Sequence, residues 1–136
     1  MTIEQLMTTV VVSVEMDDSL RVISDIFHNT RFHHILVLDE NKLVGVISDR
    51  DLLQAISPHI GTPSETTRDL ATLNKSAHQI MSRNPITITP KANFEDAILL
   101  FNSHTVSCLP VTDESNKVFG IITWRDIFKS FSGQSR

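Results

Sequence analysis

Two short stretches of this sequence place a hydroxyl, a carboxylate and an arginine at the same spacing. Residues 45–51 read Gly-Val-Ile-Ser-Asp-Arg-Asp, and residues 120–126, 75 positions later, read Gly-Ile-Ile-Thr-Trp-Arg-Asp. An apolar run that ends in a hydroxyl residue, with an aspartate three positions on, predicts a strand that passes directly into a capped helix. The pairs are Ser48 with Asp51 and Thr123 with Asp126. Because a helix start presents unpaired N–H groups, either pair could bind an anion or a ribose.

Each pair could also be a capping box and nothing more, which would contribute about 0.5–2 kcal/mol to its helix. Arg50 and Arg125 follow the cap at a position where a cation opposes the helix dipole, so they hint at a phosphate or carboxylate partner, although a surface ion pair explains them too. Asp49 would repel a phosphate, whereas Trp124 at the matching position offers a stacking face, although burial or a dimer contact explains Trp124 equally well. Spacing alone favours the capping box, whereas the matched repeat together with a family resemblance favours a ligand site for at least one pair.

The residues around these stretches predict the remaining elements. In the first half we expect a strand over residues 10–14, a helix from Leu20 to about Asn29, hairpin strands over 34–38 and 43–47, and a helix from Ser48 that ends before Pro58. The second half repeats this order at an offset of 74 or 75, with a strand over 84–88 and a helix that starts near Asn93. A loop over about residues 58–64 and then a short helix within residues 66–75 should connect the halves.

This order predicts an α/β fold of two pseudo-symmetric β-α-β-β-α repeats packed as one module. The first repeat takes residues 1–60, the connecting segment with its short helix residues 61–78, and the second repeat residues 79–136.

Composition restricts the class of protein. The 136 residues carry a formal net charge of −4 and a sequence pI near 5.8, which argues against nucleic-acid binding. No basic leader precedes an apolar run, and no apolar run approaches the ~20 residues of a membrane span, so we expect a cytoplasmic protein without membrane insertion. Cys108 has no partner for an internal disulfide and lies in an apolar strand, as buried cysteines often do.

The sequence offers no catalytic machinery that we can identify. It has no glycine-rich phosphate loop, activated nucleophile or convincing pair of catalytic carboxylates. His33 and His34 are adjacent in a strand and point to opposite faces, so a metal site with His28 is not expected. We therefore expect no enzyme, no metal and no cofactor.

The double pattern resembles the paired cystathionine-β-synthase (CBS) domain, also called the Bateman module. Its features here are the Leu-Met and Ile-Met pairs at 6–7 and 80–81, the Asn-Pro run at 84–88, the strand ends at 37–40 and 110–114, and the two turns described above. The resemblance covers about residues 6–131 and appears twice in register, which makes it specific.

This resemblance implies a regulatory module that binds an adenosine-containing ligand, such as AMP, ADP, ATP or S-adenosylmethionine, in clefts between the two repeats. Asp51 and Asp126 would accept from ribose hydroxyls, and Ser48 and Thr123 would contact ribose or phosphate. The residues implied to flank the adenine are Thr9, Val10, Val11, Asn84, Pro85 and Ile86. His33 and His34 would face phosphate in the first half, where the second half has Ser107 and Cys108.

The cleft with Thr123 and Asp126 is favoured because Trp124 replaces the repelling Asp49, although His33 and His34 favour the first cleft for phosphates. The resemblance also implies a homodimer formed through helices, and a regulated enzyme or transporter as a further partner. The alternative is a protein-interaction or dimerisation module with vestigial nucleotide clefts. An enzymatic role ranks third.

Overall fold

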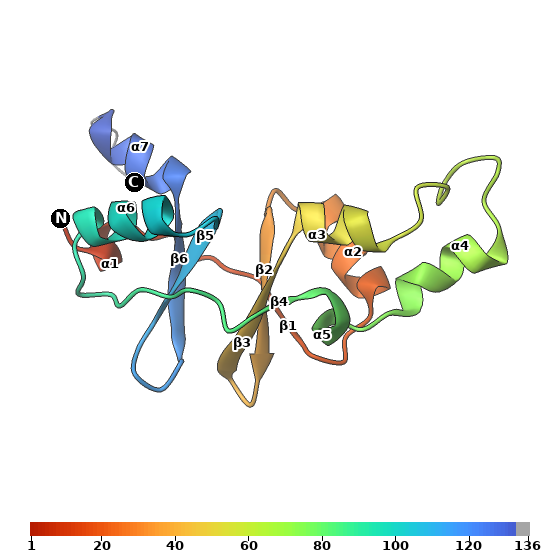
Figure 1. Cartoon of the computed structure of the whole chain (residues 1–136), viewed down its shortest axis with the longest axis horizontal. Helices are drawn as coiled ribbons and strands as arrows, with labels where there is room; N and C mark the ends of the chain where they lie inside the picture. Colours follow the sequence, from red (N-terminus) through yellow and green to blue (C-terminus); the bar gives the residue numbers. More distant parts are fainter. Residues whose placement is uncertain (133–136) are drawn as a thin grey trace. The chain divides into compact units, whose positions relative to one another are not determined.

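A β-hairpin followed without a loop by a helix occurs in each half of the chain, as the repeated pattern predicts. The structure is a computed structural model that describes residues 1–132, and its fold is mixed α/β (Figure 1). The elements are β2 (His34–Asp39), β3 (Lys42–Ser48) and α3 (Asp49–Ala55) in the first half, and β5 (Cys108–Thr112), β6 (Val118–Thr123) and α7 (Trp124–Phe131) in the second. Left-handed backbone at Glu40, Asn41 and Asn116 turns the hairpins. The predicted fold class and hairpins are confirmed.

The longer helices also begin where the sequence places their caps. Ser19 precedes α2 (Leu20–Asn29) and accepts from the Val22 N–H, whereas Asn93 precedes α6 (Phe94–Ser103) and forms a capping box with Asp96. The connecting segment contains the expected short helix, here α4 (Thr67–Ala71) followed by the 3₁₀ turn η1 (Thr72–Asn74). Short-range signals therefore set the helix starts.

The chain forms two compact units that do not coincide with the halves of the sequence. Unit 1 comprises Met1–Val11 and Pro85–Arg136, of which residues up to 132 are described, and unit 2 comprises Val12–Asn84. Residues 1–11, counted above with the first repeat, thus pack with the second hairpin. The repeat boundaries at 1–60, 61–78 and 79–136 follow internal similarity rather than contact, and they stay a prediction.

A short helix leads into each half and packs in the unit of the other half's hairpin. In unit 1, α1 (Ile3–Leu6) contacts α6 and α7, and the Ile3 N–H donates to the Ala92 carbonyl at 2.7 Å. In unit 2, α5 (Ala77–Ile80) contacts α3 and β3, and the Ala77 N–H donates to the Asp18 carbonyl at 2.8 Å. The two lead-in segments are therefore exchanged between the repeats.

The glycine of each repeated stretch makes room for the exchanged segment. A Cβ at Gly120 would lie 2.5 Å from the Thr8 carbonyl oxygen and 3.1 Å from the Met7 sulfur. A Cβ at Gly45 would collide with the Met81 side chain. Only glycine lets another segment approach the strand this closely, so the repeated glycine is explained by packing.

The first strand of each half is shorter than the sequence predicts. Strand β1 covers only Ser13–Glu15 and pairs in parallel with β2, so the strand expected over residues 10–14 is wrong at its start. Strand β4 is Ser82–Arg83, paired antiparallel to β3, and of the expected strand at 84–88 only Ile88 forms a bridge, to Val111. Residues 10–12 and 84–87 connect the two units, and the Val12 carbonyl at the end of the β-branched run accepts from the Leu36 N–H of β2 at 3.0 Å without extending β1.

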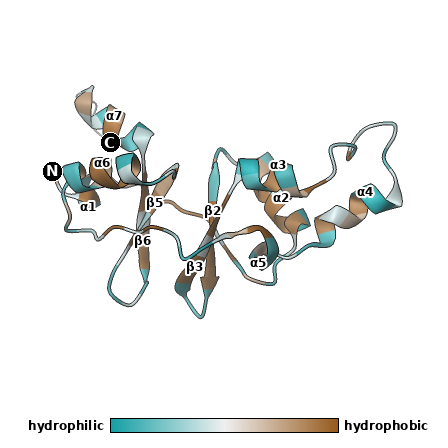
Figure 2. Cartoon of the chain, viewed as in Figure 1, coloured by the Kyte–Doolittle hydropathy of each residue, from teal (hydrophilic) through white to brown (hydrophobic). Residues whose placement is uncertain are grey.

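Each unit buries its own apolar core. Brown segments, which mark hydrophobic residues, occur in the strands and helices of both units in Figure 2. The core of unit 1 consists of Ile3, Leu6, Ile88, Ala97, Phe101, Leu109, Val111, Ile122 and Ile127. The core of unit 2 consists of Val14, Leu20, Ile23, Ile35, Val37, Ile47, Leu52, Ala77 and Met81. In both lists the lead-in helix contributes residues, so the exchange is held by apolar burial.

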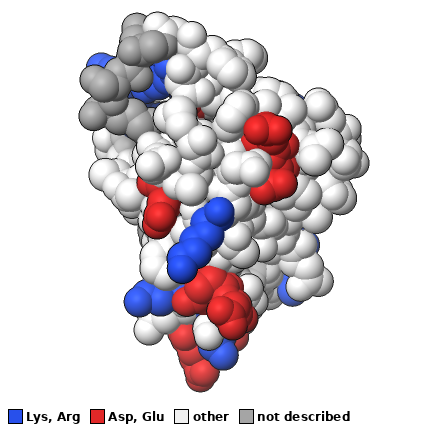
Figure 3. All heavy atoms as spheres, turned by 90° about the vertical axis from the view of Figure 1, so that its left-hand side faces the viewer, with Lys and Arg blue, Asp and Glu red and all other residues white. Residues whose placement is uncertain are grey.

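Charged side chains of both signs are interspersed on the face shown in Figure 3. Within residues 1–132 no helix has the length and apolar character needed to cross a bilayer.

Candidate functional site

In unit 2 the first residues of β2 meet the last residues of β3. The two strands are antiparallel with His34 opposite Ser48, and the Asp49 N–H donates to the His33 carbonyl at 3.0 Å. Ser48 ends the strand and caps α3, so the hydroxyl and the Asp51 carboxylate lie at the same end of the sheet as the histidine pair. The topology therefore gathers residues that the sequence separates by about fifteen positions.

The Ser48 and Asp51 pair forms the predicted capping box. The Ser48 N–H donates to Oδ2 of Asp51 at 2.8 Å, and the Asp51 N–H donates to Oγ of Ser48 at 3.1 Å. Asp51 is half-buried, and among the described residues no other hydrogen bond to its carboxylate is found. One carboxylate oxygen is thus used by the cap, while Oδ1 can accept from a ligand.

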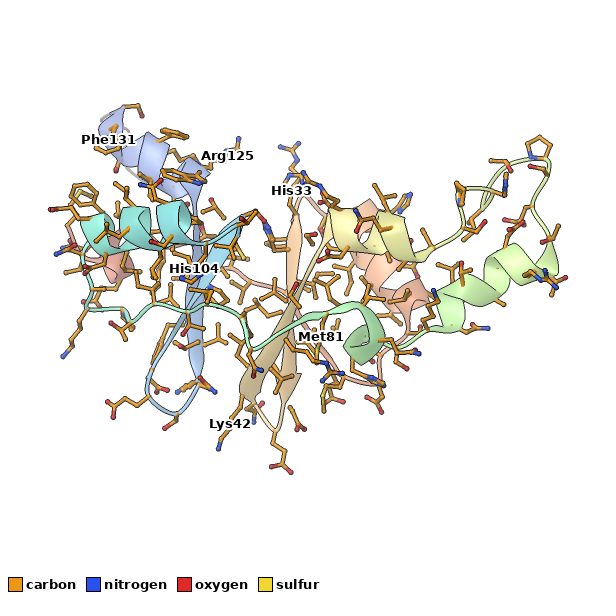
Figure 4. All side chains as sticks on the ribbon, in the orientation of Figure 1. His33, Lys42, Met81, His104, Arg125 and Phe131 are labelled. Carbon is orange, nitrogen blue, oxygen red and sulfur yellow. The ribbon has the colours of Figure 1, made fainter. Side chains whose placement is uncertain are left out.

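The two histidines beside this cap have different environments. His33, immediately before β2 (Figure 4), donates through Nδ1 to Oδ2 of Asp49 at 2.8 Å, and this hydrogen bond lowers the pKa of Asp49. Burial lowers the pKa of His34 below its usual 6.5, and the nearby Asp49 opposes this shift only in part. The Asp49 carboxylate is therefore hydrogen-bonded to His33 in the folded chain. The expectation that Asp49 repels a phosphate did not include this bond.

Unit 1 holds the second copy of the motif. The Thr123 N–H donates to Oδ2 of Asp126 at 2.9 Å, and the Thr123 hydroxyl donates to the same oxygen at 3.3 Å. The other oxygen, Oδ1, accepts from the Thr8 hydroxyl at 3.0 Å. Asp126 is only 5% exposed. Its carboxylate is therefore closed off inside the unit, in contrast to that of Asp51.

Aromatic packing explains much of the difference between Trp124 and Asp49. The Trp124 ring lies 4.9 Å from the Phe101 ring and is stacked on Phe128 at 5.7 Å, measured between centroids. The indole ring thus belongs to an aromatic cluster on α6 and α7, which agrees with the packing role that the sequence offered for Trp124 as an alternative to ligand stacking. Arg125, at the beginning of α7 (Figure 4), and Arg50 are both exposed.

The exchange divides the predicted ligand residues in a way the sequence does not indicate. Unit 2 holds His33, His34, Ser48, Arg50, Asp51 and Asn84, and unit 1 holds Thr9, Val10, Val11, Pro85, Ile86, Thr123, Arg125 and Asp126. The segment at 9–11 therefore packs in the unit of Asp126, not in that of Asp51. Asn84 adopts a left-handed conformation with φ of 49° at the junction.

Thr8 is the site residue that sequence reasoning missed. It follows Leu-Met at 6–7 just as Ser82 follows Ile-Met at 80–81, so the repeat itself marks the position. Nothing in that spacing indicates that the hydroxyl reaches Asp126, because the two residues meet only through the exchange of lead-in segments.

The lone cysteine lies opposite Thr123 in the β5–β6 ladder and is buried. Burial raises the pKa of Cys108 to about 12, so the thiol is protonated at neutral pH. Within residues 1–132 no group of three or more His, Cys, Asp or Glu side chains is arranged to hold a metal ion.

Comparison with known proteins supports the reading of a repeated domain. The CBS domain family model matches residues 3–58 and again residues 77–133. The uncharacterized protein MJ1232 of Methanocaldococcus jannaschii is 32% identical over 116 residues, which cover 85% of this chain but only 34% of the relative. The chain thus spans about a third of that relative's length.

Two solved structures resemble the whole chain. The CBS domain pair of protein MJ0100, in complex with 5′-methylthioadenosine and S-adenosyl-L-methionine, has a TM-score of 0.79 at 25% identity and covers 98% of this chain and 97% of its own. CBSX2, in complex with AMP, also has a TM-score of 0.79 at 25% identity, with 97% and 96% covered. This chain therefore belongs to the CBS domain family and carries two copies of the domain in tandem.

Proposed function

We propose that the chain is a non-catalytic regulatory module that binds an adenosine-containing ligand, and that Asp51 is the principal ribose ligand. The observation that carries the proposal is the half-buried Asp51 carboxylate, of which one oxygen caps α3 and the other can accept from a ribose hydroxyl. The complexes of MJ0100 and CBSX2 with adenosine compounds support this ligand class, which includes AMP, ADP, ATP and S-adenosylmethionine.

The remaining roles follow from chemistry and position. Ser48 and Thr123 offer hydroxyls to ribose or phosphate, and Arg50, Arg125, His33 and His34 offer positive charge or N–H donors to phosphate. Backbone and apolar side chains at Thr9, Val10, Val11, Asn84, Pro85 and Ile86 flank an adenine. The sequence favours Asp126 on account of Trp124, but we place Asp51 first because Thr8 already bonds the Asp126 carboxylate.

Calorimetric titration of Asp51→Ala, Asp126→Ala and the double variant with AMP, ATP and S-adenosylmethionine tests the proposal. Each single variant should lose one site and keep the other, and a ligand at about a hundred times its dissociation constant should stabilise the parent by ~2.7 kcal/mol per site. Binding by the double variant as tight as by the parent would show that these carboxylates only cap helices.

We also propose that the chain forms a homodimer through its helices. Large apolar side chains remain exposed on α3, α6 and α7, namely Leu53, Leu99, Phe128 and Phe131. A large contiguous patch of exposed apolar side chains often marks a partner surface, and Phe128 and Phe131 lie on the same helix. We place the module in the cytoplasm and propose an enzyme or a transporter as the class of protein that it regulates, with no nucleic-acid partner.

A protein-interaction module with vestigial nucleotide sites is the second candidate function. The observation that favours it is the closed Asp126 carboxylate, because one of the two motif copies then serves structure alone. Equilibrium dialysis against a panel of adenine nucleotides separates the two candidates: retention of none of them, by a chain that still self-associates, would favour the second. Conversion of any nucleotide to product would revive an enzymatic role.

A further inference from the structure

The two repeated aspartates differ in how many donors their own unit supplies. Oδ1 of Asp126 accepts from the Thr8 hydroxyl at 3.0 Å, while Oδ2 accepts from the N–H and the hydroxyl of Thr123. The residue is 5% exposed. Both oxygens of this buried carboxylate therefore already have donors within the unit, and a ribose hydroxyl would compete with Thr8 at Oδ1.

Thr8 is held in place by its backbone as well as by its side chain. The Thr8 N–H donates to the Ile121 carbonyl at 2.8 Å, and the Ile121 N–H donates to the Thr8 carbonyl at 2.9 Å. A β-branched side chain on a fixed backbone has few rotamers, so the hydroxyl stays directed at Asp126. The donor is preorganised and competes well with an incoming ligand.

Unit 2 repeats the arrangement of hairpin, capped helix and lead-in segment without this donor. Ser82 occupies the position of Thr8, since it pairs with Val46 in β3 just as Thr8 pairs with Ile121 in β6. Ser82 is exposed, and no hydrogen bond joins its hydroxyl to Asp51 among the described residues. The two motif copies are thus alike in sequence, but the Asp126 carboxylate accepts from a donor on each oxygen, whereas a donor from the chain is found only on Oδ2 of Asp51 among the described residues.

We propose that Thr8 is a specificity-determining residue, an internal ligand of Asp126 that occupies the acceptor atom a ribose hydroxyl needs. The inference rests on the proposed function, because it concerns the same adenosine class of ligand. The chain then has one open site at Asp51 and one closed site at Asp126, which fills only at higher ligand concentration. Ligand at the second site displaces Thr8 and loosens the exchanged N-terminal segment.

The test isolates each site in the full chain. In an Asp51→Ala background, where Asp126 is the remaining carboxylate, Thr8→Val removes the hydroxyl at nearly constant volume. Isothermal titration with AMP and with S-adenosylmethionine should then show at least about tenfold tighter binding, equivalent to about 1.4 kcal/mol. Thr8→Ser in the same background keeps the hydroxyl and should leave the affinity at the Asp51→Ala value.

The matched control uses the other copy of the motif. In an Asp126→Ala background, Ser82→Ala should leave the affinity at the Asp51 site unchanged, because the Ser82 hydroxyl does not bond that carboxylate. Thr8→Ala serves as a second truncation should Thr8→Val fold poorly, and circular dichroism establishes which variants are folded.

The outcomes separate this inference from the proposed function. If Asp51→Ala weakens binding but neither Thr8 truncation tightens the residual binding, the internal-ligand role of Thr8 is overturned and the ribose site at Asp51 stands. If the unaltered chain and every variant bind neither compound, the proposed function and this inference fall together. Tighter binding with Thr8→Val and not with Thr8→Ser supports both.

Discussion

Thr8 and Ile121 exchange two backbone hydrogen bonds, of 2.8 and 2.9 Å, although they lie near opposite ends of the chain. This bridge ties the N-terminal segment to β6 at the residue that follows Gly120. The close approach requires glycine, because a Cβ there would lie 2.5 Å from the Thr8 carbonyl oxygen. The exchanged N-terminal segment can therefore pair with β6 because residue 120 is a glycine.

Gly120→Ala should destabilise the chain strongly, by about 2–4 kcal/mol, because the added methyl meets backbone that cannot rotate away. Gly45→Ala is the matched comparison, since its Cβ meets the flexible Met81 side chain and should cost less. Urea denaturation of both variants gives the two free energies of unfolding. Equal losses, or a larger loss at Gly45, would contradict the account of the glycine contacts.

Thr8→Val should lower the free energy of unfolding by about 1–3 kcal/mol in the absence of ligand. The buried Asp126 carboxylate loses a hydroxyl donor that the valine methyl cannot replace. Ser82→Ala, at the equivalent position of unit 2, should change stability by less than about 0.5 kcal/mol because its side chain is exposed. Thermal melts of the two variants at equal protein concentration measure the contrast, and similar shifts would speak against the Thr8 to Asp126 bond.

Stability should fall as the pH drops below about 6.5, in part through His34. Burial lowers the pKa of His34 in the folded chain. As the pH falls from 6.5 toward that lowered pKa, His34 takes up a proton in the unfolded state before it does so in the folded state, and the free energy of unfolding decreases. His34→Gln should flatten this part of the profile. Denaturant midpoints of the parent and His34→Gln at pH 7.5 and 5.5 check the sign, and an unchanged slope would rule out His34 as its source.

Cys108 should resist thiol reagents in the folded chain. Its pKa is raised to about 12 and the side chain is buried in β5, so almost no accessible thiolate exists at pH 8. Reaction with a chromogenic disulfide should be slow in native buffer and complete within minutes in denaturant. Rapid labelling of the native protein would show that β5 opens readily or that the thiol is accessible.

Phe128→Glu should weaken self-association without unfolding unit 1. Phe128 is 62% exposed on α7, so a charge there is solvated in the monomer but buried in a helical dimer contact. Lys129→Gln, on the same helix and also exposed, lowers the net charge by the same one unit and controls for the change of charge. Sedimentation velocity at micromolar concentration compares the masses. A parent that sediments as a single chain with and without AMP would remove the proposed homodimer.

The sequence by itself determined the features that depend on residues within a few positions of one another. Hydrophobic alternation and turn residues locate the hairpins, and the hydroxyl and carboxylate of each repeated stretch locate the starts of α3 and α7. The capping boxes at Ser48 and Thr123 are found as predicted because a helix cap involves only four consecutive residues. The repeat of these signals was also sufficient to indicate the family.

Only the tertiary structure decided which hairpin each lead-in segment joins. The pairs at 6–7 and 80–81 are alike, and both hairpins offer a glycine, so the sequence contains no local preference for either pairing. Contacts between distant residues decide the pairing. The pairing that results leaves both first strands short, puts residues 9–11 in the unit of Asp126 and brings the Thr8 hydroxyl to the Asp126 carboxylate. The two motif copies are nearly equal in sequence, and long-range packing makes them chemically different.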